Sequence, residues 1–342
     1  MRERNIVIDV LRVLFALIIV AYHIPYGPSA SVPLFPRGYL ACEFFFMVSG
    51  YYTAKKVASY NENNVGTEHL GQETFEHIIR KIKRVFPLAV LSYIPAFVCS
   101  AFYATTLNPQ YTMYNALQNL LDAIYELTFV TMCGICGFVA NGVSWFFSAL
   151  FLSTAIVYPV LRKHYDRFVY LIAPLGSIFI LEYCSQVYGS LNLWRHDFNG
   201  FIYPGMLRAL VETSLGSVSY EISRKIGGKV PWGIPLFLYL SAMVFMARFS
   251  SFVSDFLVLI LLFAAVSAMS ALEKNFSFHS KFPLEKFSIA LVLNHIYIYY
   301  LLECIYISHK FLVYMGSVIV TSIGMTMLDR FLFGIRKRRI ES

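Results

Sequence analysis

The chain has 342 residues, of which 58% are hydrophobic and only 14% are charged. A soluble domain carries about 25% charged residues, so a soluble fold of this composition would leave much of its apolar surface in water. Intrinsic disorder is excluded as well, because it requires low hydrophobicity. The net charge of +8 does not indicate a nucleic-acid partner here, because Lys and Arg gather in the cytoplasmic loops of membrane proteins. We therefore expect an all-α, polytopic helical bundle in a lipid bilayer.

Ten segments of the chain are apolar enough to form membrane-spanning helices. A bilayer core about 30 Å thick requires about 20 such residues per helix. Residues 116–132 are an eleventh candidate, but Asp122 and Glu126 interrupt them. The predicted spans are 6–25, 38–54, 84–105, 145–161, 168–187, 202–220, 231–247, 252–271, 287–306 and 311–329.

The distribution of Lys and Arg decides between ten and eleven spans, because cytoplasmic loops carry the excess of positive charge. With ten spans and the N-terminus inside, 22 of the 28 Lys and Arg residues lie on cytoplasmic segments and 4 lie outside. If 116–132 also crossed, 11 would lie inside and 15 outside. We therefore expect ten spans with both termini in the cytoplasm, within one integral domain, 1–342. Residues 57–82 then form a cytoplasmic loop, and 106–143 form an outward segment that is interfacial or re-entrant.

The first predicted span carries three ionisable residues, Asp9, Arg12 and His23. Ionisable side chains are costly inside a membrane and by default mark a functional site. At about 100° per residue, Arg12 and His23 lie within about 20° of each other around the helix, and the rise between them is about 16 Å. A polar stripe therefore follows one face of this helix. The structural alternative is an i,i+3 pair of Asp9 with Arg12 and a His23 that lies among the lipid headgroups.

The second predicted span contains Glu43 near its outer end and the small pair Ser49-Gly50. A carboxylate in that position favours a functional role. Small residues let helices approach closely, so helix packing is the structural interpretation of Ser49-Gly50. Arg208, the other cation inside a span, precedes Glu212 by four residues. That spacing fits an i,i+4 pair and a functional site equally well.

Four cations within five residues precede Pro87 at the cytoplasmic end of the third predicted span; they are Arg80, Lys81, Lys83 and Arg84. Clusters of this kind ordinarily flank a span on its cytoplasmic side. They also suit an anion such as a phosphate group, which Arg and Lys both bind. The sequence alone fits both interpretations.

Six cysteines in a chain of this length imply no disulfide framework. Cys133 and Cys136 form a lone CxxC motif, without the second pair or nearby His that would complete a zinc site. We therefore expect no metal ion and no permanently bound cofactor.

The motifs resemble those of the membrane-bound acyltransferase-3 family. The first helix carries Arg-x10-His, from Arg12 to His23, and the second carries FFxxSG, from Phe45 to Gly50. A basic motif before a proline follows, in which Lys81 replaces the first arginine of the family's RxxR. Weaker similarities are WFFSALF at Trp145, the stretch from Arg208 to Gly216, and FSIALVLNH, which ends in His295.

This resemblance implies a membrane O-acyltransferase of the type without an appended hydrolase domain, located in the bacterial cytoplasmic (inner) membrane. Such an enzyme takes an acyl group, usually acetyl, from cytoplasmic acyl-CoA and places it on a hydroxyl of a cell-surface or lipid-linked glycan. His23 would act as a general base or carry a transient acyl group. Arg12, held by Asp9, would orient the donor or stabilise negative charge. The residues expected to bind the donor are Arg80, Lys81, Arg84, Ser49 and Gly50, and those expected on the acceptor side are Glu43, Trp145, Arg208 and His295.

A proton-coupled secondary transporter of a small anion or sugar is the alternative, because a buried Asp-Arg-His face suits such a carrier. The sequence shows no inverted repeat and no paired broken helices, which disfavours this alternative. Binding of acyl-CoA would distinguish the two functions. The acceptor glycan, the acyl chain and the oligomeric state are left open by the sequence.

Overall fold

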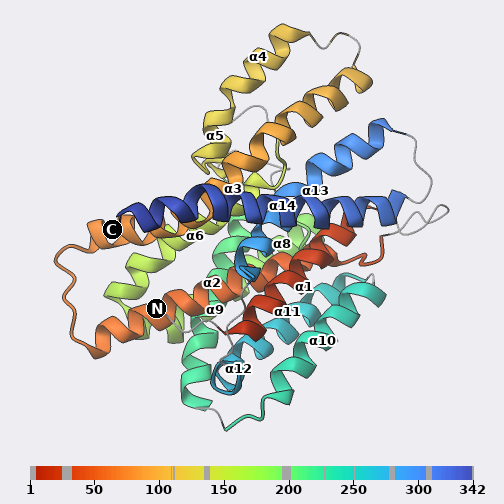
Figure 1. Ribbon diagram of the computed structural model, residues 1–342. Coiled ribbons are helices and arrows are strands. Elements are labelled where there is room, and N and C mark those ends of the chain that lie inside the picture. Colours follow the sequence, from red (N-terminus) through yellow and green to blue (C-terminus); the bar gives the residue numbers. More distant parts are fainter. Residues whose placement is uncertain are drawn as a thin grey trace. The chain divides into compact units, whose positions relative to one another are not determined.

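The computed structural model describes residues 5–24, 33–108, 110, 112–134, 139–194, 202–226, 229–249, 251–276, 282–305 and 310–340. Helices make up the regular structure within these ranges (Figure 1). The all-α class predicted from composition is therefore confirmed for the described part of the chain.

The helices follow the predicted spans closely along the chain. In order they are α1 (Ile6–Tyr22), η1 (Gly38–Leu40), α2 (Ala41–Glu62), α3 (Leu70–Leu107), α4 (Met113–Leu121), α5 (Ala123–Leu127), η2 (Thr131–Cys133), α6 (Ser144–Lys163), α7 (Tyr165–Arg167), η3 (Phe168–Ile172), α8 (Ala173–Tyr188), α9 (Pro204–Ile226), α10 (Gly233–Arg248), α11 (Phe252–Ser267), α12 (Met269–Asn275), α13 (Leu284–Cys304) and α14 (Lys310–Ile340). A helix covers the larger part of each of the ten predicted ranges.

Fewer of these helices are both long and apolar enough to cross a membrane by themselves. Among the described residues, five helical stretches meet that standard, or six if the bent pair of α11 and α12 is one span. They are Leu70–Leu107, Ser144–Lys163, Tyr165–Tyr188, Leu284–Cys304 and Lys310–Phe333. The structure thus supports a helical membrane protein, while the count of ten spans and the cytoplasmic termini stay predictions.

Two segments named in the sequence analysis, 57–82 and 116–132, differ in how continuous their helices are. The predicted cytoplasmic loop, 57–82, is helical except at 63–69, because α2 continues to Glu62 and α3 begins at Leu70. In 116–132, by contrast, the chain breaks into short helices. α4 has 9 residues and ends at Leu121, just before Asp122, and α5 has 5 residues. Neither reaches the length of about 20 residues that a span requires.

The chain packs as two compact units. Unit 1 comprises Met1–Ile8, Phe35–Lys81 and Phe146–His279, and unit 2 comprises Asp9–Leu34, Ile82–Trp145 and Ser280–Ser342. The long helix α3 therefore contributes its first part to unit 1 and the rest to unit 2.

Unit 1 is organised around a close crossing of α2 and α9. A Cβ atom added at Gly50 of α2 would lie 2.0 Å from the carbonyl oxygen of Thr213, and one added at Gly216 of α9 would lie 2.0 Å from the carbonyl oxygen of Met47. The two backbones therefore touch at positions where only glycine fits, which is how small residues bring membrane helices together. This contact is the packing role that the sequence offered for Gly50.

The rest of unit 1 packs around this crossing. One apolar cluster joins the second half of α2 to α6 and to the start of the α7–η3–α8 stretch; its buried residues are Ala54, Val57, Val157, Tyr158, Leu161, Phe168, Val169 and Ala173. The helices α10 and α11 lie side by side in the same unit (Figure 1). Tyr239 of α10 is fully buried.

Unit 2 contains the pair α13 and α14, which pack against each other. The amide Nδ2 of Asn294 donates a hydrogen bond to Ser322 Oγ at 3.1 Å across this pair. Lys286 and Asp329 form an ion pair between the same two helices. Unit 2 also holds most of α1, so the predicted catalytic helix and α13 belong to one packed body.

Candidate functional site

The polar stripe on α1 begins with an ion pair. Arg12 Nη1 donates to Asp9 Oδ1 at 2.7 Å, one helical turn away. The two residues stand at i and i+3, a spacing that places side chains on one helix face. The pairing of Arg12 with Asp9, expected from the sequence, is present in the structure.

His23 lies at the other end of the stripe, just after the last residue of α1. Its ring nitrogen Nδ1 lies 2.8 Å from the carbonyl oxygen of Ile19. A carbonyl oxygen only accepts hydrogen bonds, so Nδ1 carries the hydrogen and donates it. In the neutral ring the lone pair then belongs to Nε2, because a hydrogen bond at one imidazole nitrogen sets the tautomer at the other.

The structure brings His295, from the middle of α13, next to His23. The centroids of the two imidazole rings are 4.5 Å apart and the ring planes are tilted by 56°. His295 is 1% exposed. The sequence placed both residues among the site candidates but gave no means of knowing that they meet.

His295 is held in the same tautomer as His23. Its Nδ1 lies 2.7 Å from the carbonyl oxygen of Val292, and a carbonyl again requires Nδ1 to be the donor. Its Nε2 is buried and has no hydrogen-bond partner among the residues that the structure describes. An unpaired polar atom in a buried place calls for an explanation, such as a ligand or a catalytic role.

Side chains from two other segments of unit 2 fix the backbone of α13 beside His295. Ser92 Oγ of α3 donates to the carbonyl oxygen of Leu293 at 3.0 Å, and Asn141 Nδ2 donates to the same oxygen at 2.9 Å. The backbone N–H of Asn141 in turn donates to Glu126 Oε1 at 3.0 Å. The sequence analysis named Glu126 only as an interruption of 116–132, and it did not name Ser92 or Asn141; nothing in their spacing would have identified the three as site residues.

Unit 1 brings together two of the residues expected to bind the donor. Lys81 Nζ donates to Ser49 Oγ at 2.6 Å, and it lies 3.3 Å from Thr53 Oγ1 and 3.4 Å from Thr154 Oγ1. Three hydroxyl groups from α2 and α6 therefore surround the ammonium group. The hydroxyls of Thr53 and Thr154 donate to the carbonyl oxygens of Ser49 and Leu150, each at 2.7 Å. Of the three hydroxyls, that of Ser49 can therefore turn its hydrogen to an anion that Lys81 attracts.

Two of the other cations of the basic cluster, Arg80 and Arg84, pair with different partners. Arg80, in unit 1, pairs with Glu76 one turn earlier on α3 at 3.5 Å, and both side chains are largely exposed. Arg84, in unit 2, pairs with Glu285 at the start of α13 at 2.8 Å. The Arg80 and Arg84 side chains are 56% and 59% exposed, so both guanidinium groups are accessible to another anion.

Arg208 is the centre of a buried ionic group in unit 1. Its guanidinium contacts Glu43 at 2.6 Å and Glu212 at 3.8 Å, and it donates to the carbonyl oxygens of Tyr39 at 2.7 Å and Leu193 at 3.1 Å. All three ionisable side chains are at most 2% exposed. The i,i+4 partner predicted from the sequence, Glu212, is thus present, but Glu43 of α2 is closer.

Trp145 is half-buried in the first turn of α6. Among the described residues, no group of three or more His, Cys, Asp or Glu side chains is arranged to hold a metal ion. Of the CxxC motif, Cys133 is exposed and Cys136 lies outside the described residues.

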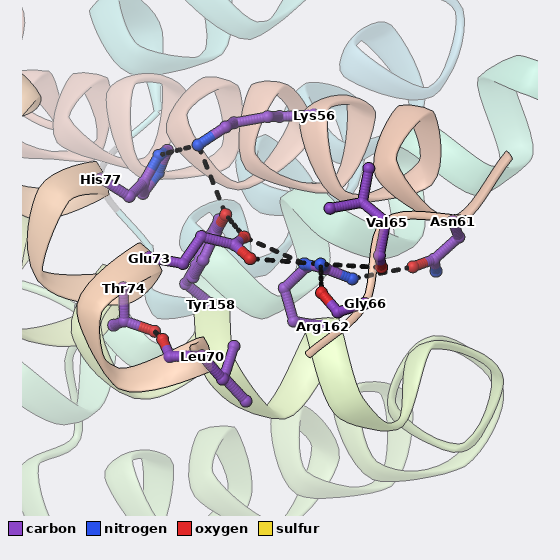
Figure 2. Close-up of polar contacts among 10 residues, drawn as sticks. All are labelled: Lys56, Asn61, Val65, Gly66, Leu70, Glu73, Thr74, His77, Tyr158 and Arg162. Carbon is purple, nitrogen blue, oxygen red and sulfur yellow. Dashed lines mark hydrogen bonds and ion pairs between the residues drawn. The ribbon is translucent and has the colours of Figure 1, made fainter. Parts of the chain in front are cut away.

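A second polar cluster, which sequence reasoning missed, ties α2, α3 and α6 together in unit 1 (Figure 2). Arg162 lies at its centre and donates to Glu73 Oε1 at 2.9 Å and to the carbonyl oxygen of Gly66 at 2.8 Å. Tyr158 donates a hydrogen bond to the same Glu73 carboxylate. Arg162 therefore closes the connection 63–69 onto the end of α6, and we interpret the cluster as structural.

Lys56 and His77 complete this cluster at the face of Tyr158 (Figure 2). Lys56 Nζ lies 3.1 Å from His77 Nδ1 and 3.3 Å from the hydroxyl of Tyr158. The rings of His77 and Tyr158 are stacked with their centroids 4.3 Å apart. His77 is 8% exposed, although its polar surroundings in the sequence resemble a solvated loop.

Comparison with known protein families gives one match, to the acyltransferase domain family, over residues 5–334. Comparisons with curated proteins and with solved structures returned no match. The matched range contains every residue described in this site, including the His23–His295 pair and the Lys81–Ser49 contact. The resemblance read from the motifs is therefore confirmed: the chain belongs to this acyltransferase family and is a membrane acyltransferase.

Proposed function

We propose that the chain is an O-acyltransferase that moves an acetyl group from cytoplasmic acetyl-CoA to a hydroxyl of a cell-surface or lipid-linked glycan, in a bacterial cytoplasmic membrane. The observation that carries this proposal is the state of His23. Its Nδ1–H is held by the carbonyl of Ile19, so its Nε2 presents a lone pair. A base with a fixed orientation is what the deprotonation of a hydroxyl requires.

The proposed reaction has His23 as its general base. Nε2 of His23 takes the proton of the acceptor hydroxyl as that oxygen attacks the thioester carbonyl carbon. The carbon–sulfur bond then breaks, and the CoA thiolate takes the proton back from His23. Imidazole suits this exchange because its ordinary pKa, about 6.5, lies near the working pH. In a second route, Nε2 attacks the thioester carbon, the carbon–sulfur bond breaks, and CoA leaves as the thiolate. The acceptor oxygen then attacks the acyl carbon, the carbon–Nε2 bond breaks, and the hydroxyl proton goes to the thiolate.

Two further groups support the proposal, each within its own unit. In unit 2, the ion pair with Asp9 fixes one edge of the Arg12 guanidinium, and such a fixed cation can orient the donor or stabilise the negative charge that develops on the thioester oxygen. In unit 1, Lys81 with Ser49 beside it suits an anionic group of CoA, and Arg80 is a further cation for its phosphates. Arg84 is a third cation of this kind, in unit 2.

The proposal is tested by acetyl transfer from radiolabelled acetyl-CoA, with purified protein in liposomes that also contain membrane extract as the acceptor source. His23→Ala is expected to reduce transfer at least about 100-fold, which is the usual contribution of a general base. The control is His69→Ala, because His69 is exposed on the connection between α2 and α3. Both variants should insert and fold as the wild type does.

Normal transfer by His23→Ala would exclude His23 as the base. If the wild-type protein neither binds nor turns over acetyl-CoA, the donor assignment fails. Solute counterflow by such a protein would then favour the transporter alternative.

A further inference from the structure

Two imidazole rings side by side, each with its lone pair on Nε2, form an acceptor pair that one hydroxyl group cannot satisfy. We propose that the acyl acceptor carries two neighbouring hydroxyl groups, as a vicinal diol of a sugar does, and that His295 accepts a hydrogen bond from the second one while His23 takes the proton of the first. This inference rests on the proposed function and specifies its substrate class.

The tautomers of both rings are the first step of the argument. His23 Nδ1 and His295 Nδ1 each lie within hydrogen-bond distance of a carbonyl oxygen of their own helix, at 2.8 Å and 2.7 Å. Both carbonyls require a donor at Nδ1. Each neutral ring therefore offers an acceptor, not a donor, at Nε2.

The second step is the spacing of the rings. Their centroids are 4.5 Å apart, which is close enough for groups on neighbouring atoms of one ligand to reach both rings. Hydroxyl groups on adjacent carbon atoms are such groups. One hydroxyl has a single hydrogen and donates one hydrogen bond, so a lone hydroxyl leaves one of the two Nε2 atoms without a partner.

The third step is the burial of His295. Its Nε2 has no partner among the described residues and is shielded from solvent. A buried acceptor that stays unsatisfied in the complex costs binding energy. Sites built to hydrogen-bond a substrate hydroxyl accordingly reject analogues that lack it. His295 thus makes the site discriminate between a diol and a simple alcohol.

The experiment compares two matched probes, trans-cyclohexane-1,2-diol and cyclohexanol, as acetyl acceptors of the wild-type protein in liposomes. The native acceptor in membrane extract serves as the positive control. The wild type is expected to acetylate the diol with a kcat/KM about tenfold higher than that for cyclohexanol, as one neutral hydrogen bond to a buried group predicts.

Two variants assign this preference to Nε2 of His295. In His295→Gln the side-chain oxygen can occupy the place of Nε2 and accept the hydrogen bond, so the preference for the diol should be retained. In His295→Asn the amide can still donate to the carbonyl of Val292, but it offers no acceptor at the Nε2 position. This variant should acetylate the diol and cyclohexanol with equal kcat/KM, whatever its overall rate.

The proposal is overturned if the wild type acetylates both probes equally, or takes neither while it acetylates the native acceptor. It is also overturned if His295→Asn keeps the preference or His295→Gln loses it. If His295→Asn does not insert, the wild type and His295→Gln decide the matter. Failure of the proposed function itself is a different result, because the wild type then transfers nothing to the native acceptor before any probe is added.

Discussion

The guanidinium of Arg208 shares two buried carboxylates, those of Glu43 and Glu212. The Oε2 atoms of both carboxylates have no hydrogen-bond partner among the described residues. A charge in this position is tolerated because its partner is present. Arg208 also donates to two backbone carbonyls, those of Tyr39 and Leu193, so it joins α9 to the residues before α2 and to the segment after α8.

Removal of this guanidinium should therefore lower the free energy of unfolding by much more than the loss of one contact would. We expect Arg208→Met to destabilise the protein by about 3–5 kcal/mol, because it leaves Glu43 charged, buried and unpaired. The free energy of unfolding is measured by denaturant titration of each variant in detergent micelles. The double variant Glu43→Gln/Arg208→Met should recover part of the loss, since it neutralises one of the two buried carboxylates that Arg208→Met leaves without their cation. Equal stability of Arg208→Met and wild type would show that the ionic group is dispensable.

At the scale of elements, the contact between α2 and α9 determines how unit 1 packs. The crossing depends on Gly50 and Gly216, each of which faces a carbonyl oxygen of the other helix. Because both obstacles are backbone atoms, a methyl group could be accommodated only if the helices separated. A shift of that kind would also change the position of Ser49, the residue before Gly50 and the partner of Lys81.

We predict that Gly216→Ala lowers the free energy of unfolding by about 1–3 kcal/mol, the usual cost of overpacking a core. Gly176→Ala is the matched control, because an added Cβ at Gly176 of α8 would meet nothing within 4 Å. Both substitutions replace a helical glycine by alanine, which by itself favours the helix. If Gly216→Ala were as stable as the wild type, or if Gly176→Ala lost as much stability as Gly216→Ala, the close crossing would be contradicted.

The sequence could predict contacts within one helix but not those between helices. The pairing of Asp9 with Arg12 follows from a spacing of three residues, and the shared face of Arg12 and His23 follows from a spacing of eleven. The contact between His23 and His295 joins α1 to α13, and no periodicity relates positions so far apart. The same holds for Lys81 with Ser49, which meet because α3 turns back along α2 after the connection 63–69. Motif similarity identified these residues as candidates, and the packing of the helices determines which of them are in contact.

At the scale of the whole molecule, the charge distribution and the helix lengths lead to different numbers of membrane-spanning helices. Among the described residues, five or six helical stretches are long and apolar enough to cross a membrane. α9 is as long as a span, with 23 residues, but it carries the buried Arg208 and Glu212, and polar residues lower the mean hydropathy of a helix. α10, with 16 residues, is shorter than the usual span of about 20. Helices that bury polar groups against other helices can cross a membrane without a strong hydropathy signal.

Labelling of single introduced cysteines shows directly on which side of the membrane each segment lies. Ten spans place Thr67 and Asp166 in the cytoplasm and Gln118 outside, and all three residues are exposed. In a background in which Cys133 and Cys136 are replaced by serine, an impermeant maleimide added to intact cells should label Gln118→Cys alone. In everted membrane vesicles it should label Thr67→Cys and Asp166→Cys.

Asp166 is the position that separates ten spans from eleven. If 116–132 crosses the membrane, every segment after it changes sides, so Asp166→Cys would be labelled on intact cells. We expect no such labelling, because α4 and α5 have only 9 and 5 residues and the positive charge that follows them would then lie on the wrong side of the membrane. A cytoplasmic Asp166 also keeps the later positive loops on the same side as the basic cluster before Pro87, where acyl-CoA is made.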